Sequence, residues 1–182
     1  RPGSRRASVL TTAGCRPPFE AKIMMSILVR DLALGELEVV AEIYGASFDE
    51  PYPEPVTASL LRTPGAWCQL AIDTEAGIPL GFVIGRVILD ESEILSVGTV
   101  PASRRKGVAT ALMNAANERA ISLGAKTLHL EVGEDNPGAV ALYKRLEFRA
   151  TGRRPNYYRR ANRRRVAAIL MTRHLTTSNK IQ

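Results

Sequence analysis

Apolar residues recur along this chain with two different spacings, and these spacings predict an alternation of strands and helices. Short apolar runs bounded by turn residues predict strands at residues 27–30, 67–72, 80–89, 94–100, 127–132, 149–158 and 166–175. Apolar stripes at helical spacing predict helices at residues 34–44, 56–62, 107–123 and 137–148. The predicted order of elements is therefore β-α-α-β-β-β-α-β-α-β-β.

Turn and capping signals support the later boundaries and suggest a topology. Gly124 can end the third helix in a left-handed conformation, and Asn136 before Pro137 fits an N-cap followed by the first helical position. The third helix links the fourth and fifth strands, so these two should run parallel with a right-handed crossover. The rest of the sheet should be largely antiparallel. The pattern predicts an α/β fold, with a mixed, mostly antiparallel sheet that carries helices on both faces.

The composition shows an excess of positive charge, and it contains too few cysteines and histidines for us to expect a metal site. The 182 residues suit one domain, and the net charge of +7 favours acidic partners such as a phosphorylated cofactor or nucleic acid, or serves only solubility. Cys15 and Cys68 are too few for a disulfide framework and suggest a reducing compartment. Only two histidines, His129 and His174, are available to bind a metal. No apolar run approaches the roughly 18 residues of a membrane helix, so we expect no membrane partner.

The two ends of the chain differ in composition from the rest. Residues 1–24 carry five basic residues against the single acid Glu20, together with prolines that disfavour a helix. We expect a disordered basic extension here, either upstream sequence ahead of a start at Met24 or a cleaved organelle-targeting peptide. Residues 25–176 then form the folded domain, and residues 177–182 form a disordered tail.

A short basic loop with one glycine separates the fourth predicted strand from the third predicted helix. The start of a helix offers unpaired backbone N–H groups and the positive end of the helix dipole. Gly107 lets the backbone approach a ligand closely, and Arg104, Arg105 and Lys106 add positive charge. The segment predicts a phosphate site, and the alternative is a solvated run of charge.

A family resemblance emerges when this loop is combined with the motifs around it. The motifs are Glu93-Ile94-Leu95-Ser96-Val97-Gly98-Thr99, Arg104-x-x-Gly107-x-Ala109, Leu130-Glu131-Val132, Asn136-x-x-Ala139-x-Ala141-Leu142-Tyr143 and Asn156-Tyr157-Tyr158. The motif that begins at Arg104 resembles the acyl-CoA pyrophosphate loop of GNAT acetyltransferases, Q/R-x-x-G-x-G/A. In this order, the motifs resemble those of the RimI-type ribosomal-protein alanine N-acetyltransferases, over about residues 26–175. The departures from the family pattern are Ala109 for a further glycine, Val100 for an Asp before Pro101, and Pro51-Tyr52 for Pro-Trp.

The resemblance implies the GNAT (acyl-CoA N-acyltransferase) fold, in which parallel strands four and five are splayed, and acetyl-CoA as co-substrate. It assigns cofactor contacts to one strand, the basic loop, a helix start and one further residue: Val97, Gly98, Thr99, Arg104, Arg105, Lys106, Gly107, Val108, Ala109, Thr110 and Asn136. The strand residues would act through their backbone, and the loop would hold the pyrophosphate. Asn136 would reach the pantetheine arm, serve only as a helix cap, or do both.

Glu131 is the candidate catalytic base, because acetyl transfer to an amine requires the amine to lose a proton. On an alternating strand it shares a face with Thr127 and His129. A glutamate with an ordinary pKa near 4.3 is mismatched by about 3.5 units to an α-amine near 7.7–8.0. Glu131 therefore needs a raised pKa, works through an ordered water, or mainly binds and orients the amine. Glu134 and Asp135 are nearby rivals, and a purely structural carboxylate is the remaining alternative.

Tyr143 is the candidate catalytic acid, because a phenol can return a proton to the departing thiolate. It also lies on the apolar stripe of its helix, where a core aromatic is the alternative. Tyr157 and Tyr158 could instead shape the substrate groove, and His129 is expected to be a strand residue and not a catalyst. Cys68 has no activating partner in the sequence, so we expect direct attack in a ternary complex.

The resemblance implies transfer of an acetyl group from acetyl-CoA to the N-terminal α-amine of a protein, with the alanine of a small-subunit ribosomal protein as the expected acceptor. The alternatives are acceptors with a lysine side chain or a small-molecule amine, and a non-catalytic CoA- or RNA-binding module. We expect a cytoplasmic monomer or weak dimer with no specific nucleic-acid partner. The basic C-terminal part would suit an acidic surface, or only the cofactor and solvent; its arginines are Arg153, Arg154, Arg159, Arg160, Arg163, Arg164 and Arg165.

Overall fold

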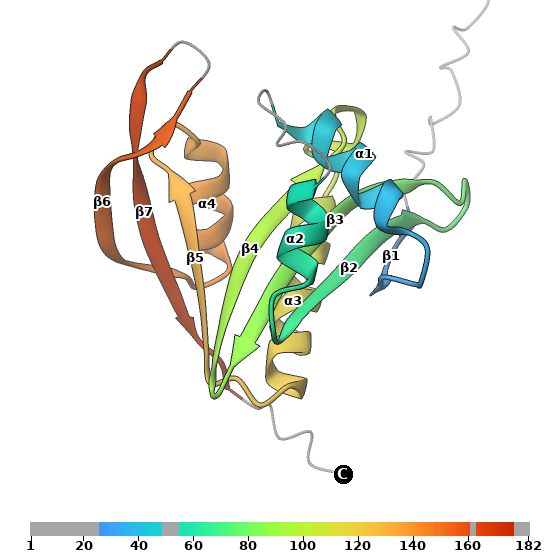
Figure 1. Cartoon of the computed structure of the whole chain (residues 1–182), viewed down its shortest axis with the longest axis horizontal. Coiled ribbons are helices and arrows are strands. Elements are labelled where there is room, and N and C mark those ends of the chain that lie inside the picture. Colours follow the sequence, from blue (N-terminus) through green and yellow to red (C-terminus); the bar gives the residue numbers. More distant parts are fainter. Residues whose placement is uncertain (1–25, 49–54, 161–162, 177–182) are drawn as a thin grey trace, which may run out of the picture.

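Seven strands form one sheet in the order β1-β2-β3-β4-β5-β7-β6 (Figure 1). The strands are β1 Ile27–Asp31, β2 Ala66–Asp73, β3 Pro79–Ile88, β4 Glu91–Thr99, β5 Thr127–Gly133, β6 Arg149–Arg159 and β7 Arg165–His174. The helices are α1 Leu37–Ser47, α2 Pro55–Leu61, α3 Val108–Ser122 and α4 Pro137–Arg145, with the 3-10 turn η1 Pro101–Ser103. The predicted order of strands and helices is confirmed.

The computed structural model describes residues 26–48, 55–160 and 163–176. The basic extension, the C-terminal tail and the Pro51-Tyr52 departure all lie outside these residues. Within the described ranges, no helix is both long and apolar enough to cross a membrane.

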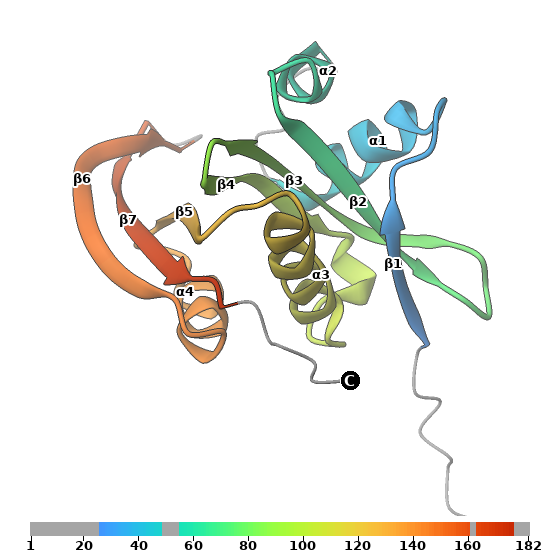
Figure 2. The same ribbon diagram turned by 90° about the horizontal axis from the view of Figure 1, so that it is seen from below.

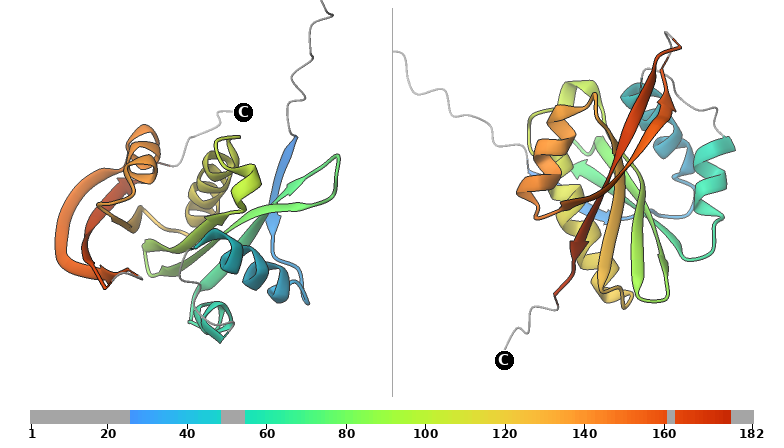
Figure 3. Two further views of the ribbon diagram at one scale, coloured as in Figure 1. Left: turned by 90° about the horizontal axis from the view of Figure 1, so that it is seen from above. Right: turned by 90° about the vertical axis from the view of Figure 1, so that its left-hand side faces the viewer.

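Helices cover both faces of the sheet, as the sequence predicts (Figures 2 and 3). On one face α1 packs through Val40, Ile43 and Tyr44, whose spacing gives a helix one apolar stripe. On the other face α3 buries a longer stripe that includes Leu112 and Met113, both of which have no exposed surface. Burial of each such side chain contributes about 1.5–3 kcal/mol, so α3 anchors the larger core.

Two helix boundaries differ from the prediction for a local reason. α1 begins at Leu37, three residues after the predicted start, because Gly35 takes a φ of +91° and Leu34 is fully exposed. α4 ends at Arg145, three residues early, and Glu147 then takes a φ of +66°. A helix cannot continue through a left-handed residue.

Strands β4 and β5 are parallel neighbours over a very short distance. They pair only from Glu91 to Glu93 with Thr127 to His129, and beyond this point they diverge (Figure 1). β5 stays paired with β7 along its whole length, whereas β4 stays paired with β3 up to Thr99. An extra residue in β4 near Leu95 shifts its register against β3, and such a bulge bends a strand. The divergence leaves one edge of β4 without a neighbouring strand.

Candidate active site

The free edge of β4 carries three of the predicted cofactor contacts. Val97, Gly98 and Thr99 pair with β3 on one side, and on the other side no strand of the described residues pairs with them. Unpaired N–H and C=O groups on a strand edge are a template for an extended ligand that carries amides. A side chain is excluded at Gly98, because a Cβ there would lie 2.7 Å from the Phe82 ring and 2.9 Å from Ser47 Oγ.

The basic loop leads into a helix start that no side chain caps. Gly107 is the N-cap residue of α3, with a φ of +90° and no capping hydrogen bond from a side chain. Arg105 also takes a positive φ, of +63°, so the chain turns sharply just before the helix. Arg105, Lys106 and Gly107 are exposed, and a Cβ at Gly107 would meet nothing within 4 Å. An uncapped 15-residue helix with cations beside its first turn fits a pyrophosphate.

The predicted contacts around the start of α3 differ in which of their atoms can reach a ligand. The Val108 side chain is buried, so only its backbone can meet a ligand, whereas Ala109 and Thr110 are half-buried. Arg104 donates from Nη2 to the carbonyl oxygen of Ser47 at 2.8 Å. Its guanidinium therefore ties the loop to the last residue of α1, and Arg105 and Lys106 are the cations that face solvent.

Asn136 caps α4, as expected from its position before Pro137. Its Oδ1 accepts a hydrogen bond from the backbone N–H of Ala139 at 3.0 Å. The residue is exposed, and capping engages the oxygen of the side-chain amide but not its NH₂ group. A cap and a ligand contact are compatible at this position.

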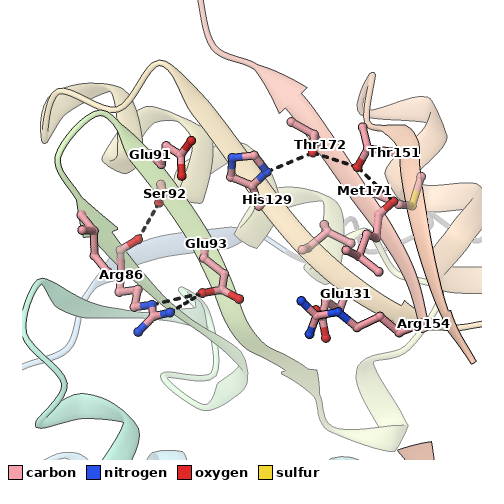
Figure 4. A pocket seen from close by; sticks show the side chains of 13 residues that line it. Arg86, Glu91, Ser92, Glu93, His129, Glu131, Thr151, Arg154, Met171 and Thr172 are labelled. Carbon is pink, nitrogen blue, oxygen red and sulfur yellow. Dashed lines mark hydrogen bonds and ion pairs between the residues drawn. The ribbon is translucent and has the colours of Figure 1, made fainter. Parts of the chain in front are cut away.

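Glu131 lies on β5, on the face opposite the buried Leu130 and Val132. Its Oε1 is 2.8 Å from Nη1 of Arg154, and its side chain is 19% exposed. The pKa of Tyr157 is raised, mainly by a hydrogen-bonding interaction with this carboxylate. The Arg154 guanidinium lies 5.5 Å from the centre of the Tyr157 ring. Figure 4 shows Arg154 reaching Glu131 from the neighbouring hairpin.

The two rival carboxylates are each held by arginines of β6 and the turn after it. Glu134 binds Arg153 at 2.5 and 2.8 Å, and Asp135 binds Arg160 at 2.6 and 2.9 Å. These hydrogen bonds lower the pKa of both carboxyl groups. Carboxylates stabilised in this way are poor proton acceptors. Glu131 is itself paired with Arg154, so the arginine pairs alone do not separate the three carboxylates.

Tyr143 is buried in the core between α4 and the sheet, with 6% of its surface exposed. Its ring packs edge-on against Phe148, with ring centres 5.9 Å apart. Burial raises the pKa of Tyr143 to about 12, so the phenol stays protonated at neutral pH. The residue is thus a core aromatic, and its hydroxyl is also kept as a proton donor.

A cavity of about 290 Å³ opens next to Glu131 at the point where β4 and β5 part (Figure 4). In it, Arg86 pairs with Glu93 at 2.9 Å. His129 places Nδ1 3.0 Å from Thr172 and Nε2 3.1 Å from Thr127, so both ring nitrogens are engaged. This network fits the expectation that His129 is a strand residue.

Sequence reasoning did not find the partnership between Arg154 and Glu131. It joins β6 to β5 across β7, next to a bulge in β6 where three residues from Pro155 to Tyr157 lie opposite one residue of β7. Asn156 takes a φ of +55° within the bulge. Pro155 within a predicted strand was the available signal, because proline in a sheet marks an edge or a bulge.

The split sheet has an uncapped helix start on one face and a partly buried carboxylate on the other. This arrangement fits an enzyme that transfers a group from an extended anionic co-substrate. The sequence profile of the Acetyltransferase (GNAT) family matches residues 37–148, and the chain therefore belongs to this family of acetyltransferases.

Several relatives share one name. The [ribosomal protein bS18]-alanine N-acetyltransferase of Escherichia coli K12 is 34% identical over 97 residues, which cover 53% of this chain and 66% of that protein. The protein of this name from Haemophilus ducreyi is 31% identical over 117 residues, or 64% of this chain and 81% of that protein. Among solved structures, the ribosomal-protein-S18-alanine N-acetyltransferase of Escherichia coli matches with a TM-score of 0.76 and 25% identity, over 86% of this chain and 99% of that one. Arabidopsis thaliana NAA60 in complex with acetyl-CoA shares the fold, with a TM-score of 0.72 and 21% identity over 82% of this chain and 99% of that one.

Proposed function

We propose that the protein transfers the acetyl group of acetyl-CoA to the N-terminal α-amine of a protein, with the alanine of a ribosomal protein as the preferred acceptor. The observation that carries the proposal is the divergence of β4 and β5, with the uncapped α3 start beside it and Glu131 at its edge. The names of the relatives in Escherichia coli and Haemophilus ducreyi support the choice of acceptor.

In this proposal, backbone groups and a few cations bind acetyl-CoA. The free edge of β4 at Val97 to Thr99 pairs with the amides of the pantetheine arm, and the start of α3 holds the pyrophosphate with Arg105 and Lys106. Asn136 contacts the arm through the NH₂ group that capping leaves available. When bound, acetyl-CoA supplies an activated acetyl group as a thioester.

The amine attacks the acetyl carbon directly, without an acyl-enzyme intermediate. Burial raises the pKa of Cys68, the one cysteine among the described residues, to about 12, which makes it a poor nucleophile. Glu131 receives a proton from the attacking nitrogen, directly or through water, as the C–N bond forms and the C–S bond breaks. Tyr143 donates a hydrogen bond to the departing sulfur.

The raised pKa of Tyr143 limits how far its phenol proton moves toward the departing sulfur. A phenol with a pKa of about 12 opposite a thiol near 8.5 makes full transfer unfavourable by about 3.5 units, or roughly 5 kcal/mol. Tyr143 therefore stabilises the thiolate mainly by a hydrogen bond, with full protonation completed as CoA leaves.

A peptide assay tests the proposal. The protein is incubated with acetyl-CoA and peptides that differ only in the first residue, and free thiol is followed over time. We expect release above background with a free N-terminal alanine and none with an N-terminally blocked peptide that contains lysine. Release with lysine side chains alone would replace the α-amine proposal, and no release with any amine would contradict acetyl transfer altogether.

A further inference from the structure

The charge of the proposed catalytic carboxylate is already compensated within the protein. Arg154 lies 2.8 Å from Glu131, and Tyr157 binds the same carboxylate. Arg154 is 53% exposed whereas Glu131 is 19% exposed, so the guanidinium is the outer partner of the pair. An acceptor amine that approaches Glu131 therefore meets a neutral ion pair with its positive end toward solvent.

The other charged groups around Glu131 do not change the compensation of its charge by Arg154. Glu93 on β4 is paired with Arg86 on β3, and His129, on the same strand as Glu131, is held between two threonine hydroxyls. Tyr158, on β6, has its pKa raised to about 12 by burial and by Glu131. Tyr143 on α4 is likewise protonated at neutral pH. Glu91, at the far end of the cavity, is exposed to water.

An ammonium ion and a free amine should bind such a site very differently. The ammonium would lose its hydration, gain little attraction from an ion pair that is already formed, and lie close to a like charge. The free amine loses less on desolvation and can still hydrogen-bond to the carboxylate. We propose that Arg154 is a specificity-determining residue that makes the acceptor site select the unprotonated amine. This inference rests on the proposed function.

The selection accounts for the proton balance of the reaction. The acceptor leaves its first proton in solvent before it binds. Glu131 takes the proton released from nitrogen as the C–N bond forms, and the thiolate gains a proton as CoA leaves. Once Glu131 has given up its proton, acetylation of a free amine therefore releases no net proton.

The same selection favours an α-amine over a lysine side chain. At pH 7 an α-amine with a pKa near 7.7–8.0 is about 10% free base, whereas a lysine amine near 10.4 is less than about 0.1% free base. The available concentration of the reactive form thus differs by about 300-fold at neutral pH.

The test is the pH dependence of the apparent KM for one alanine-terminal peptide. In the wild type, KM should rise about twentyfold from pH 8.5 to 6.5, in step with the loss of free amine, while kcat changes little. In Arg154→Gln, the exposed carboxylate binds ammonium, so KM should change less than about threefold over this range and kcat should become pH-dependent. A wild-type KM that does not depend on pH, or an Arg154→Gln variant that keeps the wild-type profile, would overturn the inference.

Three controls separate this role from a structural one. Arg153→Gln removes an arginine from the same strand with its own carboxylate partner, Glu134, and should keep the wild-type pH profile. Arg154→Lys keeps the positive charge and should therefore show the wild-type pH profile. A peptide that begins with 3-fluoroalanine has a lower amine pKa and should move the pH-dependent limb of the wild-type profile to lower pH, whereas a limb due to a group on the enzyme would stay in place. If no amine is acetylated at any pH, the proposed function fails; if amines are acetylated and the profiles coincide, only the role of Arg154 fails.

Discussion

Glu131 and Tyr143 are both recognisable in the sequence, but their surroundings decide what each can do. Glu131 is half enclosed and bound by an arginine and a tyrosine, whereas Tyr143 is buried among apolar side chains. The type of each residue can be read directly from the sequence. The neighbours of Glu131 come from a strand that lies more than 20 residues further along the chain, and no periodicity in the sequence reports them.

Substitution of Glu131 should be visible in the spectrum of a neighbouring tyrosine. Because the hydrogen bond to Glu131 is the main cause of the raised pKa of Tyr157, Glu131→Gln should lower that pKa toward the ordinary value near 10. An ultraviolet titration of phenolate formation measures this shift, and Tyr143 and Tyr158 titrate higher, at about 12. Glu134→Gln is the control and should leave the titration unchanged; an equal shift in both variants would contradict the assignment.

Removal of the Tyr143 hydroxyl should affect turnover and not binding. Tyr143→Phe keeps the edge-on contact with Phe148 and removes only the hydroxyl, which is the proposed donor to the departing sulfur. We expect kcat to fall by about 10²-fold, the lower end for a positioned proton donor, with little change in acetyl-CoA affinity. Tyr44→Phe changes a buried tyrosine on the other face of the sheet and should retain activity. Unchanged turnover in Tyr143→Phe would remove its proposed role.

At the scale of elements, the strands and helices follow from the apolar pattern because each buries one face or one stripe. The sequence did not reveal two contacts that join elements. Arg104 binds the carbonyl of Ser47, 57 residues away, and Arg154 of β6 pairs with Glu131 of β5. Both depend on how elements lie relative to one another, which periodicity does not encode. The fold was therefore more predictable than the network of the site.

Gly98 should be required for packing between β4 and α1. A Cβ at this position would lie 2.7 Å from Phe82 and 2.9 Å from Ser47, and overpacking of this kind typically costs about 1–3 kcal/mol. Gly98→Ala should lower the free energy of unfolding by that amount in urea denaturation. Gly138→Ala, in the first turn of α4 with its nearest neighbour at 3.8 Å, should instead keep the wild-type stability or raise it by up to about 0.5–1 kcal/mol. A Gly98→Ala variant as stable as the wild type would contradict the close packing.

The link between the β5–α4 connection and the β6–β7 hairpin should weaken in acid. The pKa values of Glu134 and Asp135 are lower in the folded protein than in an unfolded chain, because arginines bind the ionised forms. Their contribution is therefore fully present above the unfolded values near 4 and is lost as the pH falls through the folded values.

The comparison that checks this loss is the urea midpoint between pH 6 and pH 2. It should fall more steeply in the wild type than in an Arg153→Gln, Arg160→Gln double variant, in which the two carboxylates lose their main partners. Parallel curves for the two proteins would rule out these pairs as the source.

At the scale of the whole molecule, one sheet is held together across the divergence mainly by side chains. β4 and β5 share three residue pairs, while the core on the α3 side includes residues from both halves, such as Leu112 and Leu130. The basic C-terminal part belongs to this architecture too. Four of its arginines pair with carboxylates of β5 and the connection to α4: Arg153, Arg154, Arg160 and Arg164. Much of its charge thus serves internal contacts.

Acetyl-CoA should stabilise the folded protein, because it binds both sides of the divergence in the proposed function. At one hundred times its dissociation constant, a ligand that binds only the folded state adds about 2.7 kcal/mol to stability. A thermal melt with and without acetyl-CoA measures the effect. An Arg105→Gln, Lys106→Gln double variant should need a higher acetyl-CoA concentration for the same rise in melting temperature. A melting temperature that does not change in millimolar acetyl-CoA would contradict the proposed binding site.

The free edge of β4 has a consequence for how this site tolerates sequence change. A ligand recognised through main-chain amides does not read the side chains at Val97 and Thr99, so many substitutions there should leave its recognition intact. Only a residue that removes an N–H or fills the space at Gly98 should interfere. Much of this proposed binding surface should therefore accept sequence change without loss of ligand recognition.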